Sequence, residues 1–145
     1  MGKSKIMVAL GNEASVESLV TLACQLSQAM DADLVALHAV AMPLLTPLDA
    51  PEESIDHPGK QLLAQAQRVA ARYSRTLSTE LLRAREVEEA IVGVAKERGV
   101  DLLVMGHHKP HPHTLTETLW GGLVRYVARH SPCRVIVQIP APEPR

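Results

Sequence analysis

The chain has 145 residues, 46% of them hydrophobic, which is enough for one core and too few for two ordinary domains. A formal net charge of −1 and an aromatic content of 2% supply neither the basic surface nor the stacking platforms that nucleic-acid binding requires. The N-terminal apolar run at residues 6–10 is far shorter than the roughly 20 residues of a membrane span, so we expect no membrane insertion.

The first half of the chain predicts two buried strands, each followed by a helix. A strand over residues 6–10 leads into a turn in which Asn12 is expected to cap a helix with apolar residues from Val16 to Met30. A second strand covers residues 34–40. The four prolines within residues 41–59 then predict a long irregular loop before a helix that begins near Leu62.

The second half continues the alternation of strands and helices. Its elements are predicted over residues 77–82 (strand), 86–98 (helix), 101–105 (strand), 115–127 (helix) and 134–139 (strand). The polar centre of the strand at 77–82 favours an edge position for that strand. Gly99 is expected to end the helix at 86–98.

This alternation predicts an α/β fold: a single-domain, Rossmann-like, five-stranded parallel sheet with helices on both faces. Residues 1–140 are expected to form the domain and residues 141–145 a flexible proline-rich tail. Ligands of such sheets bind beyond the carboxyl ends of the strands, where the strand order reverses. We therefore expect a ligand near the loops that follow the first and fourth strands.

Three segments of the chain resemble the universal stress protein family. They are residues 36–40 (ALHAV), residues 100–106 (VDLLVMG) and residues 126–137 (YVARHSPCRVIV). The resemblance covers essentially the whole chain. It implies the strand order 3-2-1-4-5, a homodimer and, in one branch of the family, bound ATP or AMP.

That branch has a phosphate loop of the form Gly, two residues, Gly, nine residues, Gly, then Ser or Thr, and an aspartate after the first strand. Gly106 and Gly121 match two of the glycines, but Lys109 stands where the other glycine is expected. Eleven residues, rather than nine, separate Lys109 from Gly121, and Gly122 replaces the hydroxyl residue. Gly11 stands where the aspartate is expected. Because a Cβ atom hinders the approach of backbone N–H groups to phosphate, nucleotide binding is expected to be weakened.

If a nucleotide does bind through this altered loop, we expect its contacts at the ends of the first, second and fourth strands and near the start of the last helix. The candidate residues are Ala9, Leu10, Gly11, Val40, Gly106, Lys109, Gly121 and Gly122.

A histidine cluster lies between the fourth strand and the last helix, at His107, His108, His111 and His113. Imidazoles at alternate positions of an extended segment can converge on Zn²⁺, Ni²⁺ or Cu²⁺. The alternative is a solvated, proline-stiffened loop that binds nothing. His38, within an apolar strand, is expected to be a hydrogen-bonded core histidine rather than a ligand.

The last strand is apolar and no later element covers it, so its edge is expected to form the dimer contact. The edge residues are Val135, Ile136, Val137, Gln138 and Ile139. Cys24 and Cys133 lack the spacing of a disulfide framework, which favours reduced thiols and a cytoplasmic location.

The function expected first is a regulatory, stress-response module that is not an enzyme and acts through an unidentified protein partner, with nucleotide binding weakened or lost. The second is a sensor of ATP or AMP with an altered phosphate loop. The third is a metal-responsive module built on the histidine cluster. The sequence identifies neither the partner nor the inducing stress, nor whether a transporter is regulated.

Overall fold

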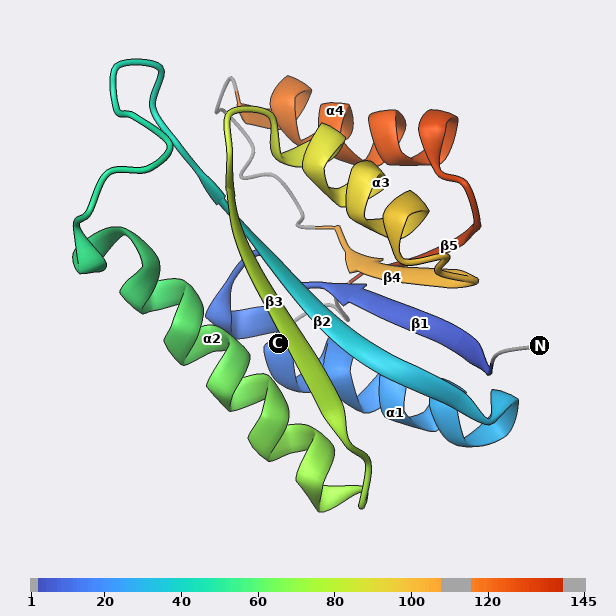
Figure 1. Cartoon of the computed structure of the whole chain (residues 1–145). Helices are drawn as coiled ribbons and strands as arrows, with labels where there is room; N and C mark the ends of the chain where they lie inside the picture. The colour runs from blue at the N-terminus through green and yellow to red at the C-terminus, as the bar shows by residue number, and fades with distance from the viewer. Residues whose placement is uncertain (1–2, 108–115, 140–145) are drawn as a thin grey trace, which may run out of the picture.

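Strands and helices alternate along the chain in the order expected (Figure 1). The computed structural model describes residues 3–107 and 116–139, the side chains of residues 116–121 excepted; the predicted tail lies outside them. The strands are β1 (Ser4–Ala9), β2 (Ala32–Ala41), β3 (Leu77–Ala84), β4 (Leu102–Gly106) and β5 (Arg134–Gln138). The helices are the short 3-10 helix η1 (Glu13–Ser15), α1 (Val16–Met30), α2 (Glu53–Arg72), α3 (Val87–Glu97) and α4 (Thr116–His130).

The five strands form one parallel sheet in the order β3-β2-β1-β4-β5, which confirms the predicted fold and the edge position of β3. The chain runs outward from β1 through β2 to β3, then crosses to β4 and runs outward again to β5. Because crossovers between parallel strands are right-handed, this change of direction puts the later helices on the opposite face of the sheet from the earlier ones.

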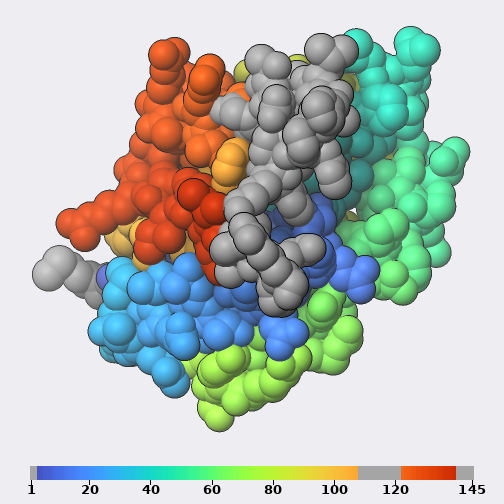
Figure 2. All heavy atoms as spheres, turned by 180° about the vertical axis from the view of Figure 1, so that it is seen from behind, coloured from blue at the N-terminus to red at the C-terminus, as the bar shows by residue number. Residues whose placement is uncertain are grey.

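Successive residues of the central strands enter two separate cores. Ile6 and Val8 of β1 belong to the core with α1 and α2, whereas Met7 and Ala9 belong to the core with α3 and α4. Figure 1 shows the two helix pairs on opposite faces of the sheet, and Figure 2, seen from behind, shows α1 (blue) and α4 (orange to red) on opposite sides of the molecule. Each central strand is therefore covered twice, which explains its continuous apolar sequence.

The predicted irregular segment at residues 41–59 is shorter than expected. Helix α2 begins at Glu53 and includes Pro58 in its second turn. The fixed φ of proline is compatible with a helix, but its missing N–H costs the helix one hydrogen bond in this turn. Ile55 and Gly59 continue the helical spacing that leads to Leu62, so packing of this face outweighs the proline signal.

Two predicted helix ends are confirmed. The Asn12 Oδ1 atom accepts a hydrogen bond from the Ser15 N–H at 3.0 Å and caps the helical segment that leads into α1. Gly99 has a φ of +63°, and the Val100 N–H donates to the Ala95 carbonyl at 3.0 Å. This left-handed glycine ends α3 in the orientation that sends the chain into β4.

Candidate functional site

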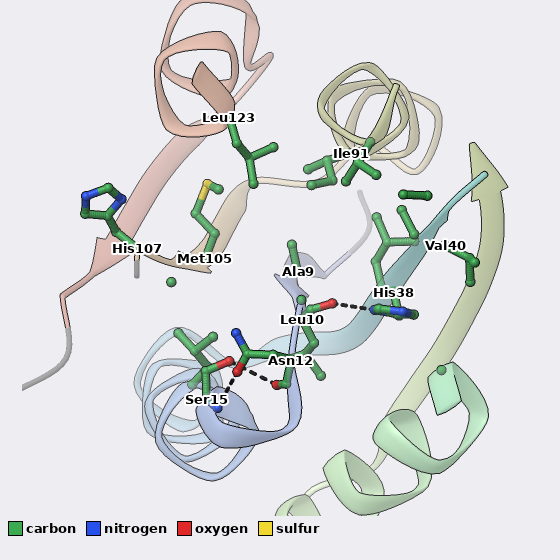
Figure 3. Close-up of a pocket in the computed structure, with 18 of the residues that line it drawn as sticks. Ala9, Leu10, Asn12, Ser15, His38, Val40, Ile91, Met105, His107 and Leu123 are labelled. Atoms are coloured by element: carbon green, nitrogen blue, oxygen red, sulfur yellow. Dashed lines mark hydrogen bonds between the residues drawn. The ribbon is translucent and has the colours of Figure 1, made fainter. Parts of the chain in front are cut away.

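A cavity of about 440 Å³ opens at the carboxyl ends of β1, β2 and β4. It lies at the point where the chain changes direction between β1 and β4, which is where ligands bind in open parallel sheets. Figure 3 shows Ala9 between Met105 and Leu123 on one side and His38 and Val40 on the other. The described lining is mainly apolar, and its polar members gather in three places.

The turn after β1 holds the first polar group. Asn12 and Ser15 both line the cavity, and they are fixed by two mutual hydrogen bonds (Figure 3). The Ser15 N–H donates to Asn12 Oδ1 at 3.0 Å, and the Ser15 hydroxyl donates to the Asn12 carbonyl at 3.2 Å. Short polar side chains are therefore held beside the start of α1, where the helix dipole favours negative charge.

His38 is the second polar member. Its Nδ1 atom lies 2.7 Å from the Leu10 carbonyl oxygen, so the side chain links β2 to the turn after β1. The ring packs against Gly59 of α2, where a Cβ atom would lie 2.7 Å from His38 Cδ2 and 2.7 Å from Leu81 Cδ1. The expected hydrogen bond of His38 is present, but the residue also lines the cavity.

The ends of β4 and β5 supply the third polar group. The His107 N–H donates to the Gln138 carbonyl at 3.0 Å. The side-chain atoms His107 Nδ1 and Gln138 Oε1 are buried and have no hydrogen-bond partner among the described residues. An unsatisfied buried polar atom costs about 1–3 kcal/mol, a cost that a polar ligand group can remove.

An arginine clamp, formed by Arg83 with Asp56 and two carbonyl groups, fixes the segment between β2 and α2. Arg83 Nε lies 3.0 Å from Asp56 Oδ1, and Arg83 Nη2 lies 3.2 Å from Asp56 Oδ2. Its Nη1 atom donates to the carbonyls of Leu48 and Ala50 at 2.9 and 2.6 Å. The clamp holds the first turns of α2, which line the cavity, against β3.

The same segment exposes leucines although its backbone is fixed. Leu44 and Leu45 are 85% and 98% exposed. Arg85 donates a hydrogen bond to the Pro43 carbonyl, and the Thr46 N–H donates to the same carbonyl at 3.1 Å. Nothing in the spacing of Arg83 and Asp56 along the sequence signals this clamp in advance.

Among the described residues, those expected at a nucleotide site that line the cavity are Ala9, Leu10, Gly11, Val40 and Gly106. Gly121 and Gly122 lie inside α4, which begins at Thr116, in agreement with the helix predicted over residues 115–127. Their backbone N–H groups are therefore in helical rather than loop backbone. Lys109 lies outside the described residues.

Of the histidine cluster, His107 lines the cavity, whereas His108, His111 and His113 lie outside the described residues. Within the described parts of the chain, no group of three His, Cys, Asp or Glu side chains could hold a metal ion. Metal binding by the cluster stays a prediction.

The chain was compared with protein families and solved structures. A family model described as the universal stress protein family matches residues 3–138. The universal stress protein UspA from Lactobacillus plantarum is 27% identical, with a TM-score of 0.75 over 94% of this chain and 99% of that chain. The comparison with curated proteins gives no match.

Two other solved structures share the fold at lower identity. A universal stress protein in complex with cAMP is 24% identical, with a TM-score of 0.69 over 94% of this chain and 97% of that chain. The universal stress protein from Archaeoglobus fulgidus in complex with dAMP is 18% identical, with a TM-score of 0.73 over 94% of this chain and 98% of that chain. No helix in the described ranges has the length and apolar character to cross a membrane.

The contact between Gly59 and His38 predicts opposite effects of two Gly→Ala substitutions. Gly59→Ala should lower the free energy of unfolding by about 1–3 kcal/mol, because the new Cβ atom overlaps His38 and Leu81. Gly93→Ala is the matched control in α3, where a Cβ atom would meet nothing within 4 Å, and should raise it by up to about 1 kcal/mol. Urea unfolding measures both; equal gains would show that α2 does not approach His38 closely.

The clamp predicts a stability difference that depends on pH. The hydrogen bonds from Arg83, and then its charge, lower the pKa of Asp56. The stabilisation is therefore fully present above the unfolded-state pKa of about 3.9 and is lost as the pH falls through the lower pKa of the folded state. Asp56→Asn should reduce stability by a constant amount from about pH 5 to 8, and this reduction should shrink below about pH 4.

Urea unfolding of wild type and Asp56→Asn at a series of pH values measures that difference. Asp49→Asn is the control, because Asp49 is an exposed carboxylate of the same segment with no ion pair among the described residues. A wild-type advantage over Asp56→Asn that grows towards low pH would contradict the proposed role of the ion pair.

Proposed function

The chain belongs to the universal stress protein family, and we propose that it is a regulatory module that binds an adenine nucleotide in the cavity between β1, β2 and β4. The observation that carries the proposal is the cavity itself. Its volume of about 440 Å³ lies within the range of roughly 300–1,000 Å³ that is typical of small-molecule sites. Its apolar walls suit a flat base, and its three polar groups suit a sugar and the edge of a base.

Solved structures with this fold support the choice of ligand class. Universal stress proteins have been solved in complex with cAMP and with dAMP. Both ligands contain an adenine base, which an apolar cavity with a few fixed polar groups can bind without a cation. The phosphate contacts would fall to residues near the carboxyl end of β4, where Gly106 lets the backbone approach closely.

The sequence favours a module that acts through protein contacts with nucleotide binding weakened or lost, whereas the cavity favours the second expected function, the nucleotide sensor. The two functions are compatible if occupancy of the cavity changes the surface that an unidentified partner protein meets. We propose binding without catalysis, so that the nucleotide should be recovered unchanged after incubation.

A calorimetric titration with AMP and ATP, each with and without Mg²⁺, tests the proposal. We expect saturable binding to wild type, and at least tenfold weaker binding to Ala9→Leu, because the larger side chain fills the middle of the cavity. Ala71→Leu, an exposed site in the last turn of α2, is the matched control and should bind as wild type does.

Heat of binding that is absent up to millimolar nucleotide would contradict the sensor and leave the protein-contact module. Equal affinity in wild type and Ala9→Leu, with both proteins folded, would mean that nucleotide binds elsewhere.

We also propose a homodimer through the free edge of β5. Val135, Ile136, Val137 and Gln138 lie in this strand, which pairs with β4 on one side and has no described strand on the other. Ile139 follows the strand and is 62% exposed. An unpaired apolar edge of this kind is a template for a second strand.

Light scattering should give a mass twice the 15.7 kDa of the chain. Ile139→Asp should weaken the dimer, because it puts a charge beside the edge that two copies would share. Leu45→Asp is the control, since Leu45 is equally apolar and 98% exposed but belongs to the segment beyond β2. A dimer that dissociates in Leu45→Asp and persists in Ile139→Asp would place the contact elsewhere.

A further inference from the structure

We propose that His38 reads the base of the bound nucleotide, and that its Nε2 atom selects a 6-amino purine over a 6-oxo purine. The inference rests on the proposed function and adds to it a residue that discriminates between ligands. It depends on the proton position in the imidazole ring, on the freedom of Nε2 and on the packing of the ring against Gly59.

The contact with Leu10 determines the proton position in the neutral ring. His38 Nδ1 lies 2.7 Å from the Leu10 carbonyl oxygen, and a carbonyl oxygen can only accept a hydrogen bond. Nδ1 must therefore carry the proton. In a neutral imidazole the other nitrogen then has a lone pair and no hydrogen, so Nε2 is a hydrogen-bond acceptor.

This acceptor is available to a ligand. His38 lines the cavity, and among the described residues Nε2 has no hydrogen-bond partner. The residue is half-buried, so part of its surface is exposed. Figure 3 shows the ring beside the cavity, held at one end by the hydrogen bond to Leu10.

Gly59 gives the ring its space on the α2 side. A Cβ atom at this position would lie 2.7 Å from His38 Cδ2 and 3.4 Å from Nε2. The absence of that atom lets α2 approach the ring while Pro58 and Ile55 of the same helix line the cavity beside it. The ring orientation is thus fixed from two sides, by a hydrogen bond and by close packing.

A fixed acceptor distinguishes purines by the group at carbon 6. Adenine carries an amino group there, which donates hydrogen bonds, whereas hypoxanthine carries an oxygen, which accepts them. Two acceptors that face each other lose a hydrogen bond on each side when water is excluded. A site built around a hydrogen bond rejects a ligand that cannot form it by a larger factor than an apolar site does. We therefore expect AMP to bind at least about tenfold more tightly than IMP.

Calorimetric titrations of AMP and IMP at pH 8 test this preference in three proteins, wild type and two variants. His38→Asn keeps an N–H donor near the position of Nδ1 and has no group at the position of Nε2. His38→Gln puts an amide near the position of Nε2, and the amide can accept from AMP or donate to IMP.

Wild type should prefer AMP by about tenfold or more. His38→Asn should lose most of its AMP affinity and bind IMP as wild type does. His38→Gln should keep AMP affinity and gain IMP affinity, so that both variants approach a ratio of one by different routes. A structural role alone would weaken both ligands together.

Equal binding of AMP and IMP to wild type would overturn the inference and leave the proposed function intact. Binding of neither ligand would overturn the proposed function and the inference with it. Should a variant fail to fold, the ¹⁵N signal of His38 Nε2 in wild type decides the matter: it should shift on addition of AMP and stay unchanged with IMP. A shift with both or with neither, at saturation, would contradict the role of Nε2.

Discussion

The change of chain direction at β1 is the constraint on which the remaining structure depends. Because β1 lies in the middle of the sheet and later strands add on both sides of it, α1 and α2 cover one face and α3 and α4 the other. The helices that follow β1 and β4, α1 and α4, therefore lie on opposite faces, and the cavity opens at the carboxyl ends of these strands, where ligands bind in such sheets. The strand order therefore determines where the cavity lies, and individual residues determine only its lining.

Much of this topology could be predicted from the sequence, because patterns among neighbouring residues indicate the strands and the helix ends. Apolar runs identify the strands, and residues with special backbone roles, such as Asn12 and Gly99, mark the helix ends. The start of α2 was the exception, since the proline signal there is local and the packing of Ile55 and Gly59 that outweighs it is not. Local rules fail where a tertiary contact determines the outcome.

The candidate site was less predictable for the same reason. The glycine pattern of the family points to Gly106, which does line the cavity, but also to Gly121 and Gly122, which lie inside α4. His38 was expected to serve the core, and its hydrogen bond to Leu10 agrees with that expectation. The second role proposed for it depends on Gly59, 21 positions later, and only the folded chain brings the two together.

The arginine side chains that hold the segment between β2 and α2 bind its backbone, so the position of the segment depends little on its side chains. Arg83 and Arg85 hold this segment through the carbonyl groups of Pro43, Leu48 and Ala50, and every residue type supplies a carbonyl group. The exposed side chains of Leu44 and Leu45 contribute little to the fold that positions them. Substitution of these exposed side chains can therefore change the chemistry of this surface while the backbone of the segment keeps its position. A contact surface here can diverge during evolution without disturbing the cavity.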